Sequence, residues 1–175
     1  MRARNPFKRA VRVPPEILTR ADLAHGERVL AGTLAADGTW LLGTRDAFLA
    51  VSEQAPTRIP WEHVERADWD RDEERFTISE VGEFGHERPR HEFVVSEPGL
   101  LLELVRERVT ASVVLQRRVP VEGGKGFVVV GRRAPKGDSE IIWAYEFDPG
   151  VEPENPAVMA RAEAALRAAK EELGG

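Results

Sequence analysis

The sequence has no cysteine, and this absence removes several kinds of chemistry at once. Without thiols the fold has no disulfide, no cysteine-ligated metal and no thiolate nucleophile. This composition fits a reducing cytoplasm, where we expect the protein to be. No segment reaches the roughly 18 apolar residues of a membrane span, and the basic N-terminus lacks the apolar core of a signal peptide. We therefore expect a chain that neither crosses a membrane nor is exported.

Catalytic signatures are missing as well. The chain has no G-x-S-x-G elbow, no HExxH helix and no dinucleotide-binding glycine pattern. Scattered carboxylates such as Glu62 and Glu65 stay open as catalytic groups, but no spacing selects them. We predict no catalytic residue, no cofactor and no metal, and we keep an enzyme of unknown chemistry as the third alternative.

Two short patterns imitate ligand sites. GGKG at 123–126 resembles a phosphate loop, but FVVV follows it, which predicts a strand where a phosphate loop needs a helix. We interpret it as a hairpin turn. Asp68, Asp70 and Asp72 alternate like the first calcium ligands of an EF-hand, but Glu73 stands where that loop needs glycine. On a strand, Asp68 and Asp70 face solvent while Trp69 faces the core.

Charge is unevenly distributed along the chain, whose formal net charge is −5. An acidic balance gives no general reason to expect nucleic acid as a partner, and no aromatic platform lies between the arginines. Residues 1–12 contain five basic residues and no acid. Residues 62–97 have a net charge of −7, and residues 98–137 have a net charge of +5. Such segregation can steer a partner or hold two protomers together; the alternative is ordinary solvated strand faces.

Short apolar runs separated by turn residues predict a small antiparallel sheet in the first half. After a short helix that starts near Pro15, the runs give strands at 27–35, 39–42, 47–52, 59–61, 64–70, 75–81 and 91–95. Asp37 and Gly38 form a strong hairpin signal, because glycine supplies the positive φ that the turn requires. Ser96 is the expected N-cap of a closing amphipathic helix that extends to about residue 109.

The last third of the chain predicts a second unit of three strands and one helix. The strands are expected at 112–121, 127–133 and 140–147, the last with an alternation of apolar side chains typical of a half-buried strand. Asn155 and Pro156 are expected to cap and begin a C-terminal helix. At about 65 residues this unit could scarcely bury enough surface alone, so we expect it to pack on the rest of the chain or on another protomer.

The order of seven strands and one helix resembles the bacterial pleckstrin-homology-like (PH-like) domains. The resemblance rests on GERVLA, GTWLLGTRDAFLA, RIPWEHVERADWD and FVVSEPGLLLELV, and covers residues 26–109. GRRAP and FDPG are also similar to a group of actinobacterial proteins, which implies no activity. The resemblance implies a curved barrel used for binding peptides, lipid headgroups or sister subunits. The predicted organisation is a basic flexible tail at 1–14, the barrel with its closing helix at 15–109, and a β-β-β-α extension at 110–175 packed on the barrel.

Basic residues are the best candidates for contact. The hairpin of the second unit contributes Arg117, Arg118, Lys125, Arg132, Arg133 and Lys136, and the tail contributes Arg2, Arg4, Lys8, Arg9 and Arg12. We predict that the hairpin faces an anionic surface; the alternative is that the acidic segment 68–74 neutralises it.

Function follows from these surfaces and from the strand edges. The leading hypothesis is a cytoplasmic, non-enzymatic module that binds protein partners or its own copies through open strand edges. The second is a peripheral module at the inner face of the membrane, which uses the basic tail in weak, salt-sensitive contact with anionic lipid.

Overall fold

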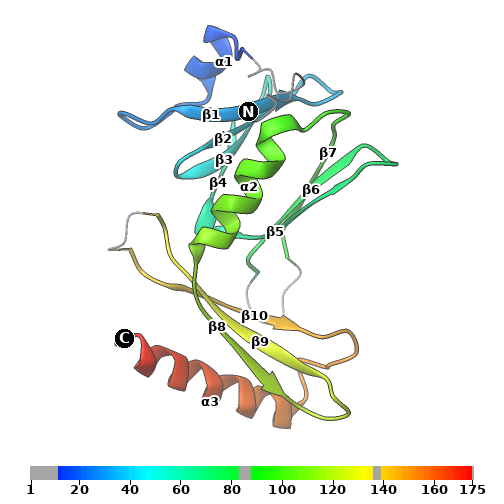
Figure 1. The fold of residues 1–175 in the computed structure, drawn as a ribbon, viewed down its shortest axis with the longest axis vertical. Helices are drawn as coiled ribbons and strands as arrows, with labels where there is room; N and C mark the ends of the chain where they lie inside the picture. Colours follow the sequence, from blue (N-terminus) through cyan, green and yellow to red (C-terminus); the bar gives the residue numbers. More distant parts are fainter. Residues whose placement is uncertain (1–11, 83–87, 136–138, 175) are drawn as a thin grey trace, which may run out of the picture. The chain divides into compact units, whose positions relative to one another are not determined.

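The structure is a computed structural model that describes residues 12–82, 88–135 and 139–174. Its described part contains three antiparallel sheets and three α-helices, so the predicted α+β class with mainly antiparallel strands is confirmed (Figure 1). The chain divides into two compact units: unit 1 comprises residues 1–80 and 90–110, and unit 2 comprises residues 81–89 and 111–175. Within the described ranges, no helix is long and apolar enough to cross a bilayer.

The first sheet of unit 1 is a meander of four strands. Helix α1 (Pro15–Arg20) precedes it and begins with the expected proline. The strands are β1 (Val29–Leu34), β2 (Trp40–Thr44), β3 (Ala47–Val51) and β4 (Thr57–Pro60), which pair in chain order. The predicted turn joins β1 to β2, since Gly38 has a φ of 87° and Asp37 Oδ1 accepts a hydrogen bond from Thr39 N at 2.9 Å.

The second sheet of unit 1 follows a 3-10 helix (Trp61–His63). Its strands are β5 (Val64–Asp70), β6 (Arg75–Glu80) and β7 (Arg90–Val94), again in chain order. Helix α2 (Gly99–Ser112) comes next. It begins three residues after Ser96, so the predicted N-cap is wrong. The residue before Pro98 is biased away from helical backbone, and Thr33 Oγ1 bonds to the carbonyl of that residue, Glu97, at 3.0 Å.

Both sheets and α2 contribute to one core of unit 1. Trp61, Phe48 and Phe76 are fully buried in it, and α2 adds Leu101, Leu102 and Val105. The indole nitrogen of Trp61 donates to the carbonyl of Thr44 at 3.1 Å, so burying this large side chain leaves no unsatisfied donor. A second cluster lies on the other face of the first sheet, where residues of α1 cover β2 and β3.

The strands described in unit 1 do not form a closed barrel. β1 pairs only with β2, and β4 pairs only with β3. At the corner after β1, the N–H of Ala36 donates to the carbonyl of Val94 at 2.9 Å. Earlier in β1, Thr33 contacts the segment that follows β7 through its side chain, because Thr33 Oγ1 donates a hydrogen bond to the carbonyl of Glu97. No backbone ladder joins β1 to β7 among the described strands. The arrangement of four and three strands is therefore shown, whereas the predicted PH-like barrel is not confirmed.

Unit 2 contains three strands and a helix. β8 (Val113–Pro120), β9 (Gly126–Arg132) and β10 (Ile142–Phe147) form a sheet of order β10-β9-β8, and α3 (Pro156–Glu172) follows. GGKG is the predicted hairpin turn: Gly123 and Gly124 have φ values of 60° and 76°, and Val121 N bonds to Lys125 O at 2.8 Å. Asn155 caps α3 as predicted, because its Oδ1 accepts a hydrogen bond from Ala157 N at 2.9 Å.

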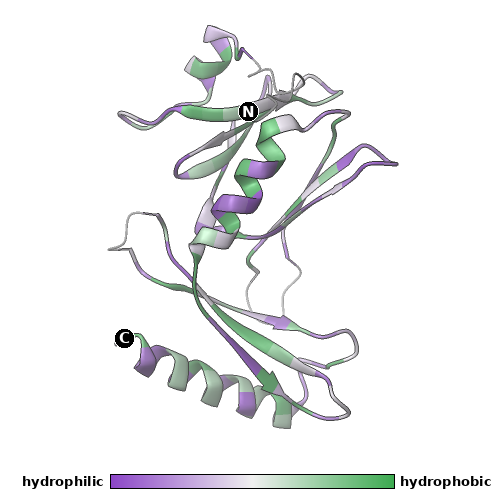
Figure 2. Ribbon diagram, viewed as in Figure 1, coloured by the Kyte–Doolittle hydropathy of each residue, from purple (hydrophilic) through white to green (hydrophobic). Residues whose placement is uncertain are grey.

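The core of unit 2 is built from aromatic rings under α3. Phe127 is fully buried, with ring centroids 6.1 Å from Tyr145 and 5.3 Å from Phe147. The helix contributes the small side chains Val158, Ala162 and Ala169. Apolar and polar residues alternate along α3, as on α2, so each helix has a face to bury (Figure 2).

Candidate functional site

The β8–β9 hairpin carries the predicted basic surface, but its arginines are already paired with acids of unit 2. Arg117 forms an ion pair with Glu172 at the end of α3, and Arg118 forms one with Asp148, which follows β10. The hydrogen bond from Arg118 Nη1 to Asp148 Oδ1 is 2.9 Å long. Within unit 2, the acids that balance these arginines are therefore Glu172 and Asp148.

Asp148 organises one end of this hairpin. It accepts hydrogen bonds from Arg118 and, at 2.8 Å, from the backbone N–H of Gly126. The Arg118 bond, followed by the Gly126 bond, holds the pKa of Asp148 below its usual range, and the charge of Lys125 acts in the same direction. The same pairing raises the pKa of Arg118. The pair is thus ionised at neutral pH, and an anionic ligand must compete with Asp148 for Arg118.

The other predicted hairpin residues have different surroundings. Arg132 is 4% exposed; its Nη1 donates to Ser112 Oγ at 3.1 Å, and its Nη2 lies 3.7 Å from Glu146 Oε1. A buried arginine does not reach an external anionic surface, so Arg132 does not belong to the predicted contact. Arg133 is half-buried and Lys125 is exposed at the turn. Lys136 lies outside the described residues.

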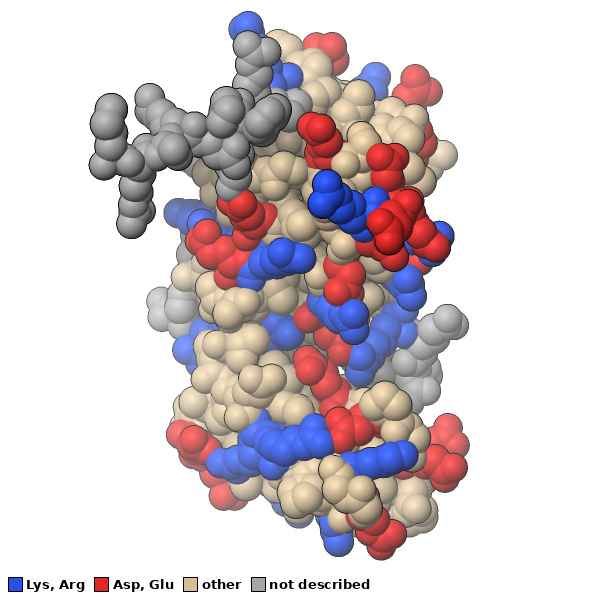
Figure 3. All heavy atoms as spheres, turned by 45° about the vertical axis from the view of Figure 1, so that its right-hand side comes forward, with Lys and Arg blue, Asp and Glu red and all other residues tan. Residues whose placement is uncertain are grey.

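Opposite charges also lie side by side on the second sheet of unit 1. Arg75 pairs with Glu73 and Arg90 with Glu92, each at 2.7 Å, and Arg66 pairs with Asp68. A concavity of about 440 Å³ is lined by charged, polar and aromatic side chains, namely Arg66, Asp68, Trp69, Asp70, Glu73, Arg75, Thr77, Ser79 and Arg90. Figure 3 shows basic and acidic side chains interspersed on the visible face. On this sheet, each of these arginines is therefore paired with an acid two residues away in the chain.

An apolar surface that the sequence analysis missed lies along β1 of unit 1. Leu30 and Leu34 are each 50% exposed, and Val94 at the neighbouring end of β7 is 52% exposed. We call these three residues the β1 margin. The signal that could have revealed them is weak, because leucines in an apolar strand normally predict core. A register shift between Val29 and Ala31 displaces Leu30 from the regular alternation.

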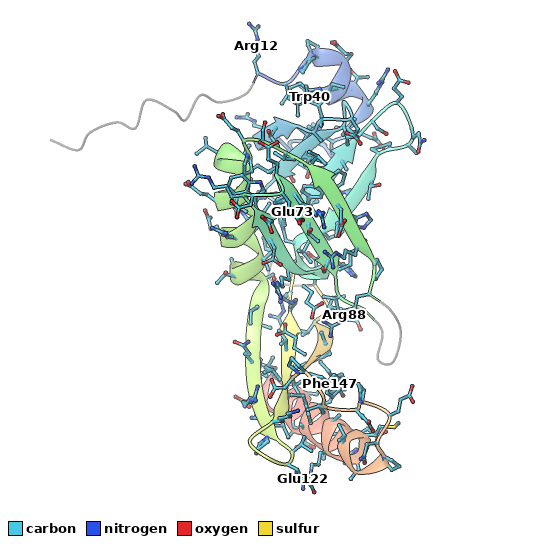
Figure 4. The ribbon with its side chains drawn as sticks, turned by 90° about the vertical axis from the view of Figure 1, so that its right-hand side faces the viewer. Arg12, Trp40, Glu73, Arg88, Glu122 and Phe147 are labelled. Atoms are coloured by element: carbon cyan, nitrogen blue, oxygen red, sulfur yellow. The ribbon has the colours of Figure 1, made fainter. Side chains whose placement is uncertain are left out.

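The basic N-terminal segment joins unit 1 beside the β1 margin. A Cβ at Gly32, midway between Leu30 and Leu34, would lie 3.6 Å from Val13 Cγ2. Arg12 precedes Val13 and is exposed (Figure 4). The other predicted tail residues, Arg2, Arg4, Lys8 and Arg9, lie outside the described residues. The margin is thus next to the attachment point of a segment with five basic residues and no acid.

Glu27 is an enclosed carboxylate of unit 1, with 1% of its side chain exposed. Its oxygens accept hydrogen bonds from Arg58 Nη2 at 2.9 Å, from Ala24 N at 2.9 Å and from the hydroxyl of Thr44. Burial raises the pKa of Glu27, but the hydrogen bonds from Arg58, Thr44 and Ala24 outweigh it and leave the pKa lowered. All its partners are structural, so we assign Glu27 to the framework and not to a ligand site.

The described part of the chain offers no cluster of metal-ligating side chains. There, no group of three or more histidine, aspartate or glutamate side chains could hold a metal ion. His91 Nε2 lies 2.6 Å from Glu80 Oε1, an isolated pair between neighbouring strands. Comparison of the chain with family models, with curated proteins and with solved structures finds no match.

Proposed function

We propose that the protein is a non-enzymatic interaction module that docks peripherally on an anionic lipid surface. The contact is made by the β1 margin together with the basic N-terminal segment. The observation that carries the proposal is the position of Leu30, Leu34 and Val94, half-exposed apolar side chains beside the attachment point of that segment. The sequence alone offers only the basic part of such a contact; the exposed leucines supply the apolar part.

The energetics favour two signals acting together. Each basic residue near an anionic surface contributes about 1 kcal/mol, a term that salt screens. Each half-exposed leucine that leaves water contributes roughly 1 kcal/mol more, a term that salt does not screen. Neither signal anchors a protein firmly alone, whereas the two together give reversible peripheral binding. The paired arginines of the β8–β9 hairpin are less suited to this contact, because lipid phosphates would have to displace Glu172 and Asp148.

We further propose that unit 1 is a PH-like domain. Two antiparallel sheets of four and three strands followed by α2 support this assignment, because the resemblance implies the same order. The proposed location is the inner face of the membrane, where anionic lipids give the surface a negative potential. No observation on the described residues favours an enzyme.

Co-sedimentation with vesicles tests the lipid proposal. The full chain should bind vesicles of phosphatidylcholine and phosphatidylglycerol, and should bind phosphatidylcholine alone much less. The double variant Leu30→Ser, Leu34→Ser should weaken binding by about thirtyfold, since two contacts of roughly 1 kcal/mol each are removed. The matched control Met159→Ser, Leu173→Ser changes two similarly exposed apolar residues of unit 2 and should bind like wild type.

A third variant replaces Arg2, Arg4, Lys8, Arg9 and Arg12 by glutamine. It should abolish the salt-sensitive part of the affinity and leave a weak, salt-independent remainder. Failure of the wild-type chain to bind anionic vesicles at low salt would overturn the proposal, as would equal binding by the Leu30→Ser, Leu34→Ser variant.

A further inference from the structure

The outer edge of β8 in unit 2 has free backbone hydrogen-bonding groups. β8 is an edge strand, because the sheet order is β10-β9-β8. The bond from Val121 N to Lys125 O fixes which residues bond to β9, since alternate residues do so in an antiparallel ladder. The odd-numbered residues of 115–119 therefore face β9, and the N–H and C=O of Gln116 and Arg118 point away from it. Within the described ranges, no hydrogen bond engages these outward groups.

This open edge is limited at both ends. A register shift between Val113 and Leu115 interrupts the regular ladder at Val114. At the other end Pro120 has no N–H, and its carbonyl already accepts a hydrogen bond from Arg161 Nη1 at 3.1 Å. A long open edge accepts strand after strand, whereas bulges and proline limit such addition. The β8 edge therefore accepts one segment that matches residues 116–118.

We propose that this segment is the β8 of a second copy of the chain, paired antiparallel about a two-fold axis at Arg117. In this register Gln116 faces Arg118 of the second copy, and Arg118 faces Gln116. Each facing pair exchanges two backbone hydrogen bonds. Such a contact is isologous and closes on itself, so it gives a dimer and not a filament.

The flanking side chains select this register. On the side of α3, the half-buried Leu115 faces Val119 of the second copy. A two-fold axis at Gln116 would instead place Leu115 against Arg117 of the second copy. Pairing about Arg117 thus matches apolar with apolar on the face of the sheet that α3 covers, and such cross-strand pairs stabilise a sheet.

The ion pairs of unit 2 make the centre of this contact electrically neutral. The axis places Arg117 directly opposite Arg117 of the second copy, and like charges in that position are unfavourable. Each arginine is already paired with its own Glu172, so arginine and glutamate alternate across the axis. An acidic partner segment fits less well, because it would have to displace Glu172 and Asp148. The charge arrangement therefore favours a second copy over an acidic peptide.

The first test is the mass of the full chain in solution, by sedimentation over a concentration series without lipid. We expect a concentration-dependent dimer. Gln116→Pro removes an outward N–H without breaking the ladder to β9, since edge positions tolerate proline. It should raise the dimer Kd at least tenfold, whereas the matched control Gln116→Thr keeps the N–H and should dimerise like wild type. Glu172→Gln should also weaken the dimer, because it leaves the two arginines unbalanced.

The register is tested by disulfide trapping, for which the cysteine-free chain is a clean background. Facing Cα atoms in an antiparallel pair are about 4.5–5.5 Å apart, within the range of a disulfide. Arg117→Cys should cross-link to itself, and an equimolar mixture of Gln116→Cys with Arg118→Cys should form the mixed dimer. Gln116→Cys alone should cross-link no faster than the control Glu154→Cys, which is exposed elsewhere in unit 2.

A monomer at every concentration would overturn the proposal, and so would a dimer that Gln116→Pro leaves unchanged. Rapid cross-linking of Gln116→Cys to itself would overturn the register. None of these outcomes bears on the lipid proposal, whose test uses vesicles and whose variants at the proposed contact lie in unit 1.

Discussion

Two edge strands, β1 in unit 1 and β8 in unit 2, begin in the same way and present different surfaces. A register shift interrupts each strand near its start, at Leu30 in β1 and at Val114 in β8. β1 then presents half-exposed leucines, whereas β8 presents Arg117 and Arg118, each paired with an acid. Both strands share the register shift, and their side chains differ in the kind of partner that they suit. The β1 margin suits a lipid surface, and the neutral, self-complementary β8 suits a second copy.

The hydrophobic cores of the two units also differ in the elements that build them. Unit 1 has a deep core between two sheets and α2, with Trp61 fully buried and its indole N–H satisfied. The core of unit 2 is formed by one sheet and one helix, so we expect a substitution in its β8–β9 hairpin to remove a larger fraction of the stability of that unit. The predictions below separate the two units, from the largest expected effect to the smallest.

Trp61→Ala should destabilise unit 1 by about 4 kcal/mol, because it empties a fully buried site and leaves the carbonyl of Thr44 without its donor. Urea denaturation measures the loss, and amide exchange in β9 reports unit 2 separately. Trp61→Phe is the milder control, since it keeps a ring but not the hydrogen bond. Equal loss of protection in β9 would mean that both cores unfold as one.

Gly126→Ala should destabilise unit 2 by about 1–3 kcal/mol. A Cβ at this position would lie 2.2 Å from the carbonyl oxygen of Val119, a backbone atom that moves only if β8 and β9 separate. Gly43→Ala is the comparison in unit 1, where the new methyl meets the flexible end of Leu104 at 2.6 Å. Thermal unfolding of both variants should show the larger loss for Gly126; a larger loss for Gly43 would contradict this account.

Glu27→Gln should cost about 2 kcal/mol at pH 7, since it weakens a charge-assisted hydrogen bond from Arg58 at an enclosed site. The lowered pKa of Glu27 means that its contribution is fully present above the ordinary value of 4.5 and is lost as the pH falls through the folded-state pKa. Chemical denaturation between pH 7 and pH 3 should therefore show the difference between variant and wild type shrinking toward low pH. A difference independent of pH would refute the role of ionisation.

Asn155→Ala should cost about 1 kcal/mol, because it removes the side-chain cap from the N–H of Ala157. The loss should appear as faster amide exchange in the first turn of α3, with unit 1 unchanged. Asn155→Ser is the matched control, since serine also caps helices and should retain most of the stability. Equal destabilisation by both substitutions would argue against a capping role.

The local elements of this fold were largely predictable from sequence. The turns at Gly38 and at Gly123–Gly124 and the cap at Asn155 were predicted correctly, because each depends on residues adjacent in the chain. The N-cap at Ser96 was predicted wrongly, since Pro98 biases Glu97 away from helical backbone and Thr33 binds the carbonyl of Glu97, so that α2 begins only at Gly99. A capping signal therefore fails where a distant strand competes for the same backbone.

The candidate sites were less predictable. The sequence marks the hairpin arginines as candidates for contact with an anionic surface or with the acidic segment 68–74, but Glu172 and Asp148, which lie 55 and 30 residues away, bind Arg117 and Arg118. It gives no sign that Arg132 is buried against Ser112, or that Leu30 and Leu34 are exposed. Ion pairing and burial depend on which strands become neighbours, and spacing along the chain does not encode that for residues far apart.

The sequence by itself determined the order of strands and helices, the turns, the cap of α3 and the absence of thiol chemistry, because periodicity, glycine and proline act over a few residues. Only the tertiary structure decided which charges cancel, which arginine is buried, which leucines remain at the surface and which backbone groups of β8 point away from β9. These properties arise from register and from strand order, and both are set by the packing of the whole chain.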